Sequence, residues 1–148
     1  MTPANRLDVK GLAVFDYLVY PVERTVADKV CATMQSYPGG RESSRVKDLV
    51  DLVLHVTRYG MAGSDLSRAI EREAGMRKIG PLGAFRVPDS WRGPREGAYR
   101  KAAAEAKIPD RWLGVKDAER IVKACVDPAI RQRVEGLEWD PEALEWTS

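Results

Sequence analysis

Cysteine, histidine and long apolar runs are scarce in this chain of 148 residues, which has two cysteines and one histidine. Cys31 and Cys125 belong to no CxxC motif and no Cys/His cluster, so we expect two reduced thiols rather than a disulfide or a zinc site. The chain has no run of about 18 apolar residues and no basic-then-apolar leader. These absences predict a cytoplasmic protein without a membrane span.

An excess of charge of either sign is also lacking. The 24 Lys and Arg residues nearly balance the 22 Asp and Glu residues, and the net charge of +2 is too small to indicate nucleic-acid binding by itself. Hydrophobic residues make up 44% of the chain, enough for one ordinary core. With no internal repeat and no linker, residues 1–148 are predicted to form a single domain.

Residues 20–54 carry the clearest pattern, which is two helices joined by a polar loop. In the first helix Pro21 suits the entrance. Apolar residues then recur every four positions and predict a core-facing stripe, namely Val22, Val26, Val30 and Met34. Lys29 lies on another face, and the pattern ends before Pro38, Gly39 and Gly40.

The second helix is predicted to begin with Ser43 or Ser44 as its N-cap. Its apolar residues follow at helical spacing and predict a second core-facing stripe. These residues are Val46, Leu49, Val50, Val53 and Val56.

Polar residues share another side of this second helix. Arg45, Asp48, Asp51 and His55 are three, three and four positions apart, a spacing that aligns them roughly in a row. Such a row can hold a metal, orient a lysine or meet a phosphate. It also fits an ordinary solvated face, because pairs such as Lys47 with Asp51 contribute only about 0.2–0.5 kcal/mol on a helix surface.

The remaining pattern predicts a mainly α protein of the α+β class, a helical bundle of about five helices with a short N-terminal β element. Residues 12–20 are predicted to form a strand, with residues 6–10 as a shorter partner. Because an exposed edge strand tends to pair with another chain, self-association through it is expected. A third helix is capped by Ser64 or Asp65 and ends near Gly75, and its charged residues are interpreted as a solvated face. Two more helices follow, at residues 97–107 and from about residue 115 to Asp127-Pro128. The buried stripe predicted for the last helix consists of Val115, Ala118, Ile121, Val122 and Cys125.

The middle of the chain is rich in Gly and Pro between residues 76 and 97, where Phe85, Val87 and Trp91 are predicted to anchor the loop. Residues 77–107 contain eight Lys or Arg against three Asp or Glu. Basic residues interleaved with Trp91 and Tyr99 can steer a polynucleotide, and they also fit a solvated loop with ordinary arginines.

The C-terminal tail has the opposite charge. Residues 135–148 contain five acids and no base, together with Trp139 and Trp146. Two tryptophans rarely stay fully exposed. We therefore expect the tail to pack back, across the basic middle, rather than to serve a partner.

Two strings in residues 20–54 resemble a known family. YPVERTVADKVCA, followed by SSRVKDLVDLV, resembles the C-terminal half of AbiEii/AbiGii-type nucleotidyltransferase toxins, the toxin half of type IV abortive-infection or toxin–antitoxin pairs. The residues that match are Tyr20, Pro21, Glu23, Ala27, Asp28 and Lys29, then Arg45, Lys47, Asp48 and Asp51. Asp127-Pro128 and the tail from Trp139-Asp140-Pro141 to Trp146 are also similar to the ends of some members.

The resemblance implies transfer of a nucleotide from a nucleoside triphosphate, with Mg²⁺, onto the acceptor end of tRNA. It implies that Lys29 contacts the triphosphate and that Asp48 or Asp51 supports the reacting site. Arg45 and Lys47 would then neutralise phosphate charge, which suits a reaction that relies on well-placed cations. A cognate antitoxin is the implied partner.

The G-S-x-x-x-D-x-D metal motif of that family is not found in the nineteen residues before Tyr20, where Asp8 and Asp16 are the only carboxylates. We expect either that another polypeptide completes the metal site or that the chain is a catalytically incomplete homologue. In the second case it would bind a nucleotide or a partner. A helical protein that only associates with a partner is the third reading.

Overall fold

A computed structural model describes residues 20–148. The predicted strand at residues 12–20 and its partner at residues 6–10 lie outside the described residues, except for Tyr20. Self-association through that strand therefore stays a prediction.

The described chain is mainly helical, which confirms the predicted fold class. Its helices are α1 (Val22–Met34), α2 (Lys47–Arg58), α3 (Gly63–Met76), α4 (Glu96–Glu105) and α5 (Val115–Ile130). Three short 3₁₀ segments, η2 (Pro38–Gly40), η3 (Asp89–Arg92) and η4 (Asp110–Trp112), join them. Three short strands, β1 (Met61–Ala62), β2 (Glu138–Asp140) and β3 (Glu145–Thr147), form one small sheet.

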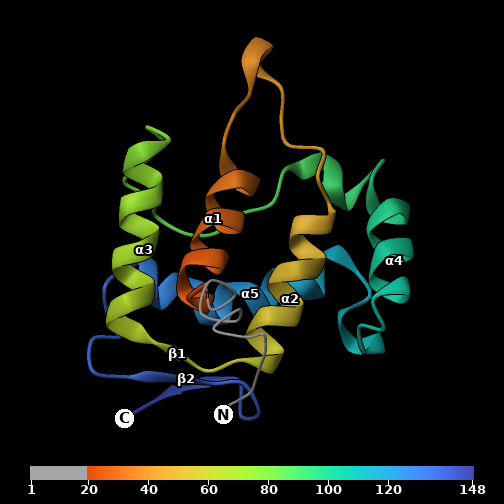
Figure 1. The fold of residues 1–148 in the computed structure, drawn as a ribbon. Coiled ribbons are helices and arrows are strands. Elements are labelled where there is room, and N and C mark those ends of the chain that lie inside the picture. Colours follow the sequence, from red (N-terminus) through yellow and green to blue (C-terminus); the bar gives the residue numbers. More distant parts are fainter. Residues whose placement is uncertain (1–19) are drawn as a thin grey trace, which may run out of the picture.

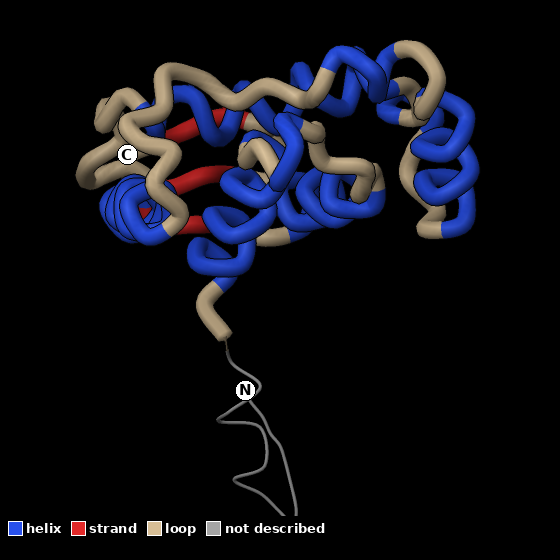
Figure 2. Tube along the Cα trace, turned by 90° about the horizontal axis from the view of Figure 1, so that it is seen from above, coloured by secondary structure: helices blue, strands red, loops and turns tan. Residues whose placement is uncertain are grey.

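Helix α1 lies between α3 on one side and α2 on the other, with α5 behind them (Figure 1). Helix α4 stands at the edge of the molecule away from α3, and the strands lie at the opposite end of α1 from η2. Viewed from above, α4 is separated from the strands by the other helices (Figure 2). None of the helices in residues 20–148 has the length and apolar character needed to cross a membrane.

The predicted apolar stripes meet in a single core. Val26 and Val30 of α1 are completely buried, while Val22 and Met34 at its two ends pack partly against the same core. The stripes of α2 and α5 are buried as the spacing predicted. Because each stripe has helical periodicity, its burial determines which face of each helix is exposed to solvent.

The small sheet was not predicted. Strands β1, β2 and β3 are antiparallel, with Met61 opposite Trp139 and Trp139 opposite Trp146. The Trp139 indole N–H donates to the Val56 carbonyl oxygen at 2.7 Å, and that of Trp146 donates to the Cys125 carbonyl oxygen at 3.0 Å. The tail therefore packs back as expected, but onto α2 and α5. It does so because these helices offer both apolar cover and carbonyl acceptors to the indoles.

Both predicted N-caps are wrong. Helix α2 begins at Lys47 after Val46, without a side-chain cap, and the Ser43 hydroxyl instead accepts the Arg45 N–H. Helix α3 begins at Gly63, so Ser64 and Asp65 lie inside it. A tertiary contact replaces the local cap, because the Glu23 carboxylate of α1 accepts the Ala62 N–H at 2.8 Å.

The predicted end of the last helix at Asp127-Pro128 is also wrong, since α5 continues through Pro128 to Ile130. A proline lacks the N–H that an interior helix position uses. Ala129 is buried in the core, and its packing holds the last turn helical in spite of the lost donor.

The Gly- and Pro-rich loop before α4 is anchored as predicted, with Phe85, Val87 and Trp91 buried. Its backbone bonds to side chains of α5. The Asp127 carboxylate accepts the Phe85 N–H at 2.8 Å, and the Glu119 carboxylate accepts the Val87 N–H at 2.9 Å. Two nearly buried carboxylates thus take the place of a neighbouring strand.

Gly63 packs tightly against the backbone of Val134, just before the tail. A Cβ on Gly63 would lie 1.9 Å from the Val134 carbonyl oxygen. We predict that Gly63→Ala lowers the free energy of unfolding by about 1–3 kcal/mol or more, because the backbone must move to accept the methyl group. Urea unfolding measures this change.

The matched control is Gly97→Ala, since a Cβ on Gly97 of α4 meets nothing within 4 Å. Alanine favours a helix over glycine by up to about 1 kcal/mol, so stability should hold or rise. Equal stability of the two variants would show that the backbone at Val134 does not pack against Gly63 as described.

Candidate functional site

Lys29 lies at the interface between α1 and α2, facing two carboxylates of α2. Its Nζ is 3.1 Å from Asp51 Oδ2 and 3.6 Å from Asp48 Oδ1. The side chain of Lys29 is only 19% exposed. Its ammonium group is therefore held in place by two opposite charges from the neighbouring helix.

Two further cations complete this group. Arg45 Nη2 is 3.4 Å from Asp48 Oδ1, and Lys47 Nζ is 3.6 Å from Asp51 Oδ1. Each carboxylate thus has two cationic neighbours. We call the group the Lys29 cluster, and its members are Lys29, Arg45, Lys47, Asp48 and Asp51. It contains all five residues that the sequence indicated as catalytic or phosphate-binding.

The members of the cluster differ in exposure. The side chains of Arg45 and Lys47 are 71% and 76% exposed, as expected for residues of a solvated helix face. Lys29 and Asp48 are not on such a face, since the Asp48 side chain is 3% exposed. The polar row of α2 had three possible roles, namely to hold a metal, to orient a lysine or to meet a phosphate. The structure shows the second arrangement, since the Lys29 ammonium lies near both carboxylates.

His55, the fourth member of the row, does not join the cluster. Its Nδ1 lies 2.6 Å from the Asp51 backbone oxygen, and its ring lies 5.6 Å from that of Tyr59. The histidine therefore bonds within its own helix.

Asp48 has an unusual environment for a carboxylate. It is almost completely buried, and its Oδ2 has no hydrogen-bond partner among residues 20–148. A buried carboxylate without compensation is strongly unfavourable. The two cations near Oδ1 offset this, and the unpartnered oxygen remains available to a donor.

The donor set in residues 20–148 does not fit a Mg²⁺ site. No group of three or more His, Cys, Asp or Glu side chains among these residues could hold a metal ion. Asp48 and Asp51 both face the Lys29 ammonium, which a metal ion would have to displace. We therefore assign no metal chemistry to the described residues.

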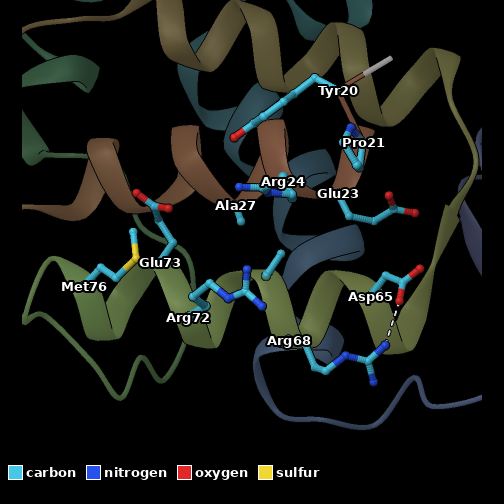
Figure 3. Close-up of a pocket in the computed structure, with 11 residues that line it drawn as sticks. Tyr20, Pro21, Glu23, Arg24, Ala27, Asp65, Arg68, Arg72, Glu73 and Met76 are labelled. Atoms are coloured by element: carbon cyan, nitrogen blue, oxygen red, sulfur yellow. Dashed lines mark hydrogen bonds and ion pairs between the residues drawn. The ribbon is translucent and has the colours of Figure 1, made fainter. Parts of the chain in front are cut away.

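A second charged site lies on the other side of α1, and the sequence did not indicate it. A pocket of about 320 Å³ between α1 and α3 is lined by three arginines, Arg24, Arg68 and Arg72. Figure 3 shows Arg24 of α1 and Arg72 of α3 extending into the same space. In the sequence, the spacing of Arg68 and Arg72, four residues apart on α3, is the one local feature that points to this site. We call this site the arginine pocket.

Trp91 and Tyr99 of the basic middle cannot stack on the bases of a polynucleotide. Trp91 and Tyr99 are both completely buried, and the Tyr99 hydroxyl donates to the Trp112 carbonyl oxygen at 2.8 Å. Several basic side chains in this region are exposed and have no ion pair with the residues described. They are Lys78, Arg86, Arg95, Lys101 and Lys107.

Comparison with known families gives one match. A family model described as "Nucleotidyl transferase AbiEii toxin, Type IV TA system" matches residues 2–133. The matched region includes the Lys29 cluster, the arginine pocket and the basic middle, and it ends before the strands of the tail. No curated protein and no solved structure matches the chain.

The burial of Asp48 makes the stability of the fold depend on Lys29. We predict that Lys29→Met lowers the free energy of unfolding by about 3 kcal/mol, because it leaves a buried charge poorly compensated. Replacing the pair by apolar residues, with Lys29→Met and Asp48→Leu together, should recover most of that loss. Urea unfolding of both variants measures the difference.

Lys47→Met is the matched control, because the exposed Lys47–Asp51 pair contributes less than about 0.5 kcal/mol. If Lys29→Met were no more destabilising than Lys47→Met, the buried carboxylate would not depend on Lys29.

The two cysteines are free and buried, in agreement with the sequence. Burial raises the pKa of the Cys31 thiol to about 12, although the nearby Arg77 opposes the effect. Burial also raises the pKa of Cys125. Both thiols should stay protonated at mildly alkaline pH and resist iodoacetamide in the native protein, since the thiolate is the reactive form. Mass spectrometry should detect alkylation of both only in denaturant, and rapid native alkylation of either thiol would contradict this.

Proposed function

Because this chain belongs to the AbiEii nucleotidyl transferase toxins of type IV toxin–antitoxin systems, we propose that it takes part in transferring a nucleotide from a nucleoside triphosphate to RNA. The family gives nucleotidyl transfer and the toxin–antitoxin context. The observation that carries the proposal for this chain is the Lys29 cluster.

Lys29 is the residue we assign to the triphosphate. An ammonium group has three N–H donors, and the Lys29 ammonium has ion pairs with Asp51 and Asp48. A donor of this group can bind a phosphate oxygen. The two carboxylates act as positioning groups, because they hold the long lysine side chain in one orientation before the nucleotide arrives. Phosphoryl-type transfer depends mainly on such positioning and on cations near the charged oxygens.

Arg45 and Lys47 lie at the exposed rim of the cluster. Both have exposed side chains that can turn from their carboxylate partners to an incoming phosphate. The cluster has three cations and two carboxylates, so its balance is positive and favours a polyanion. A guanidinium group also matches phosphate in a bidentate geometry.

The exposed basic residues in the loop before α4 and in and around α4 support RNA as the acceptor. Their side chains can contact successive backbone phosphates, which supply much of the affinity for nucleic acid. The acceptor end of tRNA is the target we propose within this class. A cognate antitoxin is the proposed protein partner, in keeping with the family.

A second candidate is nucleotide binding without transfer. The observation that favours it is that both carboxylates of the cluster are paired with cations and that residues 20–148 contain no set of metal ligands. In this case the cluster would bind a nucleotide or orient a partner, and the chemistry would belong to another polypeptide.

The experiment incubates the whole chain with Mg²⁺, tRNA and each α-labelled nucleoside triphosphate in turn. Wild-type protein should label the RNA. The variant with Lys29→Met and Asp48→Leu should fold, because the charged pair is replaced as a unit, and should lose about 100-fold in rate, the effect typical of removing an oriented electrostatic contact. Arg131→Met is the control, since Arg131 is an exposed cation outside the cluster, and it should label RNA at the wild-type rate.

The outcomes separate the two candidates. Wild-type protein that binds triphosphate through Lys29 but labels no RNA would support binding without transfer. Undiminished labelling by the folded double variant would remove Lys29 from the mechanism and leave the Lys29–Asp48 pair with a structural role.

A further inference from the structure

The arginine pocket is lined by three arginines and three carboxylates, so its formal charge is balanced, but the pairing within it is uneven. Each of the three carboxylates has a partner. Glu23 accepts the Ala62 N–H, Asp65 pairs with Arg68 at 2.7 Å, and Glu73 accepts a hydrogen bond from Arg77 at 2.8 Å.

Two of the three arginines therefore remain without an ion pair among residues 20–148, namely Arg24 and Arg72. They come from different helices and extend into the same space (Figure 3). Both side chains line the same pocket, and a guanidinium group can bind phosphate oxygens in a bidentate manner. A phosphate in this pocket could therefore be bound by both arginines.

An aromatic side chain stands at the rim of the same pocket. Tyr20 is 55% exposed, and the Arg24 guanidinium carbon lies 4.9 Å from the centre of its ring. Exposed aromatic rings stack on nucleobases. The inner wall is formed by small residues, Ala27 and Ala69, which leave room for a ligand.

We propose that the arginine pocket binds one nucleotide, with its phosphate group between Arg24 and Arg72 and its base against Tyr20. The volume of about 320 Å³ lies near the lower end of small-molecule sites, as a single nucleotide requires. A free nucleotide and a nucleotide within an RNA strand offer the same chemistry.

This site is separate from the Lys29 cluster. Ala27 lines the pocket toward α3, whereas Lys29 points to α2, and two residues along a helix correspond to a turn of about 200°. The inference therefore does not rest on the proposed transfer reaction, because binding in the pocket needs neither Lys29 nor chemistry.

The test uses the isotope-labelled whole chain in NMR titrations with AMP, inorganic phosphate and a short single-stranded RNA. AMP or the RNA should shift the Nε–H signals of Arg24 and Arg72 and the ring signals of Tyr20. The pair of changes Arg24→Gln and Arg72→Gln should weaken binding about tenfold or more, as expected for lost hydrogen bonds to charged groups.

The matched control changes two exposed arginines outside the pocket, with Arg58→Gln and Arg131→Gln together. It removes the same charge and should bind as the wild type does. Tyr20→Leu should weaken the binding of AMP and leave the binding of inorganic phosphate unchanged. Because all these side chains are exposed, unfolding midpoints should stay close to the wild-type value and show that each variant is folded.

Binding of AMP would show that a free nucleotide is sufficient. If only the RNA bound, and the pocket variant lost affinity for it, the ligand would be a nucleotide within an RNA strand. No shift at Arg24 and Arg72 with any of the three probes would overturn the inference. Equal affinity in the pocket variant and the control variant would overturn it as well. The folded variant with Lys29→Met and Asp48→Leu should retain AMP binding, so that failure of the transfer proposal and failure of this one are distinguishable.

Discussion

The buried carboxylate of Asp48 sets the arrangement of the first two helices. A charge that leaves water needs an opposite charge close by, and Lys29 provides it from α1. The core valines of α1 limit how that helix can rotate, and the ion pair selects one of the allowed orientations. Once Lys29 faces α2, the periodicity of the helix turns Arg24 and Ala27 toward α3. The Lys29 cluster and the arginine pocket thus both follow from one orientation of α1.

The same requirement explains how a loop with many glycines and prolines is held. Backbone N–H groups that are removed from water must be bonded, and the loop before α4 has no neighbouring strand. The carboxylates of Glu119 and Asp127 on α5 accept two of these N–H groups, while Lys123 donates to the Phe85 carbonyl oxygen at 2.9 Å. The loop therefore has a definite position. Anchoring of its backbone leaves the side chains of Arg86 and Arg95 exposed.

Membership of a nucleotidyl transferase family and the geometry of the Lys29 cluster agree in one respect. The resemblance of the sequence to the family points to a lysine, two more cations and two carboxylates, and the structure brings these five side chains together at the interface of α1 and α2. The described residues offer little to a metal, since the ammonium of Lys29 takes the position near both carboxylates. The role we propose for these residues is therefore positioning of phosphate rather than binding of a metal.

Local pattern was informative wherever a residue interacts within its own helix or with the next one. Helical periodicity predicted the buried stripes of α1, α2 and α5, and the spacing of Arg45, Asp48 and Asp51 predicted a polar row. It failed where a local signal competes with a distant partner. Ser43 and Ser64 have the chemistry of N-caps, but packing placed the helix starts elsewhere. Strand β1 has two residues, too few for a pattern.

By itself, the sequence determined the helical class and the resemblance to the family, and that resemblance pointed to the five residues of the Lys29 cluster, because periodicity and motifs are carried by short stretches of chain. Only the tertiary structure decided that Lys29 lies between two carboxylates, that the tail packs onto α2 and α5, and that Arg24 and Arg72 share a pocket. The physical reason is that more than forty residues separate Arg24 from Arg72. Helical periodicity relates side chains within a few turns, whereas the burial of a common core brings such distant helices together.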